Sequence, residues 1–140
     1  MPHIVYGRVG RVAVMVAGRE NPSDVEWDRY IDFLEEMRTP GPSSRTLAVS
    51  AGGAPSSTQR VRLEQRIGEM RKGSKLAVVT GSTFARGVLN GWALVRPGYR
   101  AFSPDKIDEA IRFLDVPPAS ISEVEGLVSQ LQAELGPART

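Results

Sequence analysis

Hydroxyl side chains gather in two short stretches of the sequence, and their types suit the binding of an anion or the acceptance of a phosphate. The first stretch, 52–58, has two glycines and a proline before Ser56, Ser57 and Thr58. The second stretch, 80–86, contains Thr80, Ser82, Thr83 and Arg86. Backbone N–H groups at the start of a helix attract phosphate, so each stretch is a candidate anion site if a helix follows it. A serine or threonine in that position also caps a helix without any ligand.

Other site chemistry is poorly represented in the chain. The sequence contains neither G-x-x-x-x-G-K-[ST] nor G-x-G-x-x-G, so no motif supports a nucleotide site. Cysteine is absent and the single histidine, His3, lies beside the N-terminus, which argues against a disulfide framework, a histidine-ligated metal and a histidine-based nucleophilic triad. We therefore expect a protein that is not an enzyme and that has no metal or other cofactor.

Apolar stretches of two different periods alternate along the chain and define its elements. Two strands are expected around Val9 and Gly10, and further strands at 45–51, 75–80 and 99–102. Helices are expected from Ser23, where Glu26 completes a capping box, and then over about 57–72, 82–95, 103–114 and 120–135. Alternating strands and helices predict an α/β fold with a central, mostly parallel sheet of four or five strands and an antiparallel first pair. Near-continuous apolar character places the segments 12–17, 47–50 and 76–80 on inner strands.

The chain is expected to divide into an α/β domain at 1–116 and a C-terminal helix and tail at 117–140. The apolar residues of that helix alternate steps of three and four. They are Ile121, Val124, Val128, Leu131 and Leu135. The helix is the best partner-interface candidate in the sequence, and it suits packing on the domain or against a second copy in a homodimer.

Charge is distributed unevenly, although the formal net charge is only +2. Residues 59–100 contain nine basic and two acidic side chains, whereas residues 20–38 contain seven acidic and two basic ones. The basic middle segment is therefore the part of the chain best suited to bind an anion. The alternative interpretation is that the two segments form solvated helix surfaces of opposite charge that bind no ligand. Few aromatic residues separate the basic ones, which argues against a nucleic-acid partner. Arg8 and Arg11 interrupt the apolar N-terminus, so we expect no secretory signal, no membrane insertion and a cytoplasmic location.

The segments "KLAVVTGSTFARGVLNGWALV" and "YRAFSPDKIDEAIRFL" place a strand-helix-strand unit before an aromatic strand and an "F-S-P" helix. This pattern resembles the SpoIIAA-like (STAS) fold of anti-sigma-factor antagonists and related regulatory modules, and the resemblance covers roughly Val5 to Leu114. It implies a binding or signalling module without catalysis. In the antagonists, a serine or threonine between the third strand and the next helix is phosphorylated, and Ser56, Ser57 and Thr58 occupy the corresponding place. The flanking residues differ, since Pro55 replaces the usual acidic neighbour.

These observations favour a non-enzymatic regulatory or scaffold module that binds a protein partner. The alternative is a small-anion or nucleotide binder that uses the stretches 52–58 and 80–86.

Overall fold

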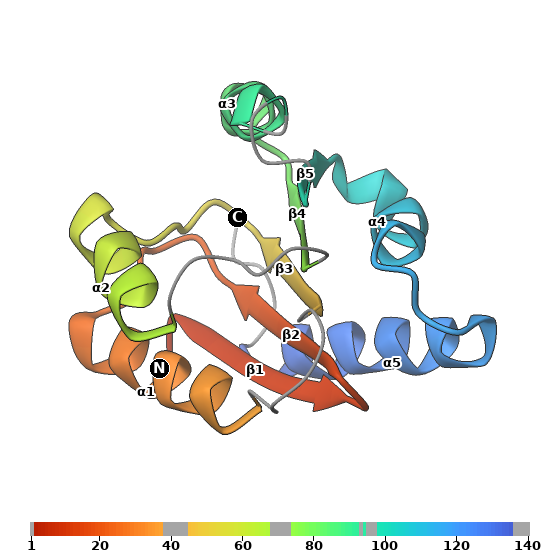
Figure 1. The fold of residues 1–140 in the computed structure, drawn as a ribbon, viewed down its shortest axis with the longest axis horizontal. Helices are drawn as coiled ribbons and strands as arrows, with labels where there is room; N and C mark the ends of the chain where they lie inside the picture. Colours follow the sequence, from red (N-terminus) through yellow and green to blue (C-terminus); the bar gives the residue numbers. More distant parts are fainter. Residues whose placement is uncertain (1, 38–44, 68–73, 93, 95–97, 136–140) are drawn as a thin grey trace.

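The computed structural model describes residues 2–37, 45–67, 74–92, 94 and 98–135. Strands and helices alternate in the predicted order through these residues (Figure 1). The strands are β1 (Ile4–Val9), β2 (Val12–Ala17), β3 (Arg45–Ser50), β4 (Lys75–Thr80) and β5 (Tyr99–Phe102). The helices are α1 (Asp24–Met37), α2 (Ser57–Ile67), α3 (Thr83–Trp92), the short 3-10 turn η1 (Pro104–Lys106), α4 (Ile107–Phe113) and α5 (Pro118–Glu134).

The five strands form one sheet in the order β1-β2-β3-β4-β5, which puts β2, β3 and β4 inside as predicted. The sheet is mixed rather than mostly parallel, and its antiparallel first pair is the one that the sequence predicted. β1 pairs antiparallel with β2, and the pairs β2–β3, β3–β4 and β4–β5 are parallel. The antiparallel pair follows from a tight turn after Val9, in which Gly10 adopts a φ of 56° that glycine tolerates best.

Helices cover both faces of the sheet. On one face, Met15 and Ala17 of β2 pack with Trp27, Tyr30 and Ile31 of α1. On the other face, the alternate residues of the inner strands pack against α4 and α5. Every residue of β2 is buried, because both of its faces are covered. Figure 1 shows α1 and α2 side by side at the left of the view, and α3 at the top, next to β4 and β5.

Helix α5 packs on the domain and belongs to the same core as the sheet. Val124, Val128 and Leu131 are buried there, and Ile121 and Leu135 pack against this cluster while partly exposed. The apolar stripe has the predicted period, and its buried members pack against β1, β2 and α4. Packing on the domain is one of the two arrangements that the sequence left open. Helix α5 thus shares its hydrophobic core with the strands and with α4.

No helix among the described residues is both long enough and apolar enough to cross a membrane.

Candidate functional site

The two hydroxyl-rich stretches follow adjacent parallel strands. Ser50, the last residue of β3, lies opposite Thr80, the last residue of β4, so both following loops begin at the same edge of the sheet. This is the edge at which open α/β sheets usually bind ligands. The first stretch turns toward the loop after β2, because the Gly53 N–H donates to the Gly18 carbonyl (2.8 Å) and the Ala54 N–H to Asn21 Oδ1 (3.0 Å).

Ser56 caps helix α2 through a reciprocal pair of hydrogen bonds. Its Oγ accepts from the Gln59 N–H (3.1 Å), and Gln59 Oε1 accepts from the Ser56 N–H (2.9 Å). This is a capping box, which satisfies two N–H groups that the start of a helix otherwise leaves unpaired. Ser57 and Thr58 lie in the first turn of the helix with exposed side chains. Capping thus accounts for one of the three hydroxyls, and two face solvent.

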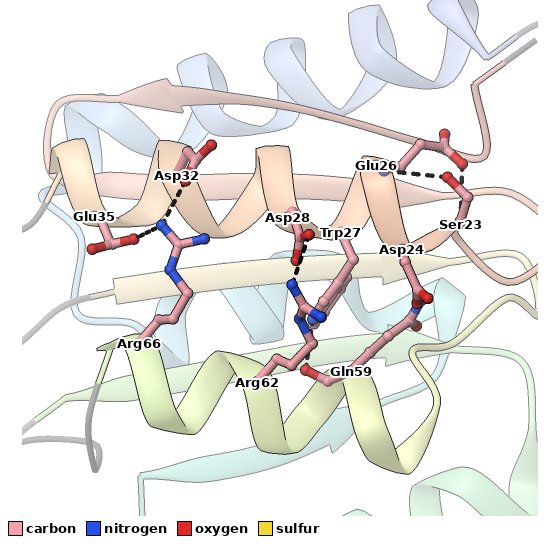
Figure 2. A network of polar contacts seen from close by, with 10 residues as sticks. All are labelled: Ser23, Asp24, Glu26, Trp27, Asp28, Asp32, Glu35, Gln59, Arg62 and Arg66. Atoms are coloured by element: carbon pink, nitrogen blue, oxygen red, sulfur yellow. Dashed lines mark hydrogen bonds and ion pairs between the residues drawn. The ribbon is translucent and has the colours of Figure 1, made fainter.

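Gln59 is the key residue of this region, although the sequence analysis did not single it out. Its side chain is buried, and its Nε2 donates to the Pro22 carbonyl and to Asp24 Oδ1, both at 3.0 Å. Its backbone carbonyl accepts from Trp27 Nε1 (2.7 Å) (Figure 2). Gln59 therefore joins the starts of α1 and α2. A glutamine three residues after a serine is a recognised sequence signal for this arrangement.

The acidic and basic regions of the chain pair with each other across α1 and α2. Arg62 contacts Asp28 (2.8 Å), and Arg66 contacts both Asp32 (2.6 Å) and Glu35 (Figure 2). These side chains are partly exposed, so solvent screens the attraction within each pair. Part of the positive charge of the middle segment is thus used inside the fold, and it is not available to an external anion.

The second stretch forms a polar network at the start of α3. Thr80 Oγ1 accepts from the Ser82 N–H (3.2 Å), and Ser82 Oγ accepts from the Ala85 N–H (3.1 Å). Arg86 turns back to donate to the Thr80 carbonyl (2.6 Å) and to Thr83 Oγ1 (3.4 Å). The structure therefore brings together the four predicted residues Thr80, Ser82, Thr83 and Arg86. Their interactions hold the helix to the end of β4.

Two acidic groups surround His3 near the N-terminus. The His3 ring contacts Glu26 (2.6 Å) and Glu20 (2.9 Å), and the hydrogen bond to Glu26 raises the pKa of His3 against an opposing effect of burial. Burial raises the pKa of Glu26, but hydrogen bonds from Ser23 and His3 outweigh it and bring that pKa to about 2. Glu26 also completes the predicted capping box, since it accepts from the Ser23 N–H (3.0 Å) and donates its own N–H to Ser23 Oγ (3.2 Å). This cluster fastens β1 to the start of α1.

An open groove lies along β5, between α3 and α4, and we call it the β5 groove. Its volume is about 660 Å³. Its lining residues are Arg86, Asn90, Arg100, Ala101, Phe102, Ser103, Lys106, Glu109, Arg112 and Phe113. The groove has four cationic side chains, and only Arg86 was predicted as a site residue. The other three come from separate elements that are brought together only in the folded chain.

No family model matches the chain, and no curated protein or solved structure is significantly similar to it.

Function must therefore be inferred from the exposed chemistry of the fold itself. Among the residues described, the hydroxyls of Ser56 and Ser82 are used for helix capping. Two surface features of the described residues are candidates for binding a ligand or a partner. One is the outer face of α3, where Phe84 is 82% exposed and Val88 is 41% exposed. The other is the positive charge of the β5 groove.

Proposed function

We propose that this chain is a non-enzymatic regulatory or scaffold module of the STAS-like type, which acts by binding a protein partner. The observation that carries the proposal is the outward apolar face of α3. Phe84 and Val88 are one helical turn apart and exposed, and Leu94, just beyond the helix, is 89% exposed. Exposed apolar side chains grouped in this way mark interaction surfaces, and phenylalanine is enriched in the cores of protein interfaces.

Two polar residues of α3, Arg86 and Asn90, bond to the strands β4 and β5. Arg86 donates to the carbonyl of Thr80, and Asn90 Oδ1 accepts from the Ala101 N–H of β5 (2.9 Å). Among the apolar residues of α3, Ala85 and Leu89 are partly buried, whereas Phe84 and Val88 are exposed. A helix on the surface of a soluble protein normally directs its apolar stripe inward. A methyl group added at Gly87 or Gly91 would meet nothing within 4 Å, so space is open around the helix there too. The exposure of Phe84 and Val88 favours a partner that covers this part of the helix.

The STAS-like resemblance adds a means of regulation. Ser57 and Thr58 are exposed in the first turn of α2, where the helix dipole favours added negative charge. Ser56, by contrast, is occupied as the cap of the same helix. We therefore expect any phosphate in this stretch on Ser57 or Thr58, and phosphosite mapping of protein from its own cells tests this expectation.

The partner surface can be tested by affinity capture with the full chain as bait, followed by mass spectrometry. The double variant Phe84→Ser/Val88→Ser should lose the specific partner, because its only change is on the outer face of α3. Val61→Ser is the matched control, since Val61 is a 50%-exposed apolar residue on α2. The control should retain the partner. Both baits should keep the wild-type melting temperature, because the substituted side chains are exposed.

Retention of every wild-type partner by the Phe84→Ser/Val88→Ser bait would contradict this assignment.

A further inference from the structure

The β5 groove concentrates positive charge from four different elements. Arg86 comes from α3, Arg100 from β5, Lys106 from η1 and Arg112 from the last turn of α4. Glu109 is the one acidic residue among those that line the groove. Side chains so far apart in the sequence converge only through the fold, and their positive charge, which Glu109 offsets only in part, favours an anion in the groove.

The contacts of these cations leave charge available for a ligand. Arg86 is held by a neutral carbonyl, that of Thr80, and Arg100 lies over the ring of Phe102 at 5.4 Å. Lys106 forms a long ion pair with Glu109 (3.6 Å) in which both side chains are more than half exposed. Asp105, the neighbour of Lys106 in the sequence, has a lowered pKa, mainly because Ser103 donates a hydrogen bond to it and also because of the charges of Lys106 and Arg86.

The shape of the groove and its aromatic residues restrict the kind of anion. The groove is open to solvent, whereas sites for small ligands usually enclose most of the ligand surface. The ring of Phe102 is covered by Arg100, and that of Phe113 by Lys75 at 4.8 Å. A nucleobase therefore has no free aromatic ring on which to stack. An extended chain that carries several carboxylates fits an open, cationic groove better than a nucleotide or a nucleic acid does.

We infer that the β5 groove binds an acidic peptide segment of the protein partner. This inference rests on the proposed function, because it describes the chemistry of one segment of the protein partner proposed there. The groove lies beside α3, because Arg86 and Asn90 of that helix line it. Phe84 and Val88 are exposed residues of the same helix, and their spacing from Arg86 and Asn90 puts them on its other side. A partner that covers α3 can thus place an acidic segment along β5. Charged contacts of this kind mainly set specificity and the rate of association.

A fluorescein-labelled decapeptide of glutamate is a direct probe, with a decapeptide of glutamine as the neutral reference. Fluorescence anisotropy at low salt should show binding of the glutamate peptide alone, with an affinity that falls as salt is added. The double variant Arg100→Gln/Arg112→Gln should weaken this binding about tenfold, since hydrogen bonds to charged groups are among the stronger ones. Arg11→Gln removes one exposed charge from the β1–β2 turn and should change the affinity less than about twofold.

The inference is overturned if the glutamate peptide does not bind at millimolar concentration, or if the Arg100→Gln/Arg112→Gln variant binds it as tightly as the wild type. It is also overturned if inorganic phosphate or ATP displaces the peptide at equal or lower concentration, because the groove is then a small-anion site. The Phe84→Ser/Val88→Ser variant should still bind the peptide. If the Phe84→Ser/Val88→Ser variant loses the native partner but the wild type does not bind the peptide, only the proposal for the β5 groove is refuted. If the wild type binds the peptide but the variant still captures the native partner, only the assignment of the partner surface to α3 is refuted.

Discussion

Substitution of Gly53 by alanine should destabilise the protein through a collision between two loops. A Cβ atom at this position would lie 2.2 Å from the Glu20 carbonyl oxygen and 2.9 Å from the Gly18 carbonyl oxygen. Both are backbone atoms, so no side chain can rotate away. Since ordinary contacts begin at 3.4 Å, the loop after β3 must move by about 1 Å to accept the methyl group.

The cost can be estimated from the interactions that this movement disturbs. Overpacking a tight site typically costs about 1–3 kcal/mol. The same shift weakens the bond from the Gly53 N–H to Gly18 (2.8 Å) and that from Ser50 Oγ to the Gly53 carbonyl (2.6 Å), each worth roughly 0.5–1.5 kcal/mol. We therefore expect a loss of roughly 2–4 kcal/mol in the free energy of unfolding, and a fall in melting temperature on the order of 10 °C.

Urea unfolding followed by circular dichroism measures this loss directly. Gly126→Ala is the matched control, because it makes the same chemical change in α5, where the new Cβ atom meets nothing within 4 Å. Removing a glycine from an open helical position should stabilise the protein by about 0.5–1 kcal/mol. A Gly53→Ala protein within about 0.5 kcal/mol of the wild type, with an unchanged urea dependence, would show that the two loops are not packed as described.

The remaining predictions concern the core, the α1–α2 joint and the N-terminal cluster. Leu131→Ala should cost about 2–5 kcal/mol of unfolding free energy, and a cost below about 1 kcal/mol in urea unfolding would exclude α5 from the cooperative core. Gln59→Leu should cost about 2–4 kcal/mol by leaving Pro22 and Asp24 without their donor, whereas Gln65→Leu, at an exposed position of the same helix, should be near neutral in the same assay. Glu26 has a folded pKa of about 2, below its ordinary value of 4.5, so its stabilising contribution is present above about pH 4.5 and is lost as pH falls toward 2. Glu26→Gln should flatten the stability curve over this range, and a curve as steep as that of the wild type would refute the role of the carboxylate. The pKa of His3 is raised in the folded state, so its pH dependence is opposite to that of Glu26. The contribution of His3 to the free energy of unfolding is full below pH 6.5 and is lost as pH rises through the higher folded pKa. His3→Gln should abolish this loss, which urea unfolding between about pH 6 and 9 measures.

Residues whose role depends on local pattern could be predicted from the sequence. The apolar runs of β2, β3 and β4 identified the inner strands, since only strands covered on both faces tolerate such runs. The spacing of Ser23 and Glu26 identified a capping box, and the same spacing at Ser56 and Gln59 would have identified the second one.

Residues whose role depends on long-range packing could not be predicted. The spacing of Phe84 and Val88 defines one face of a helix, but spacing does not show whether that face turns toward the sheet or toward solvent. The stripe of α5 left packing on the domain and contact with a second copy equally open until its buried neighbours were known. The cations of the β5 groove belong to four elements, so no local window of sequence contains more than a part of the site.

The hydrogen bond between Asn90 and Ala101 has a consequence for how the sheet can grow. β5 is an edge strand, and an edge strand with free N–H groups invites the backbone of another chain to extend the sheet. Here a side-chain amide oxygen occupies the place that the carbonyl of an added strand would take. A peptide along β5 must consequently be held by side chains rather than by a regular ladder of backbone bonds.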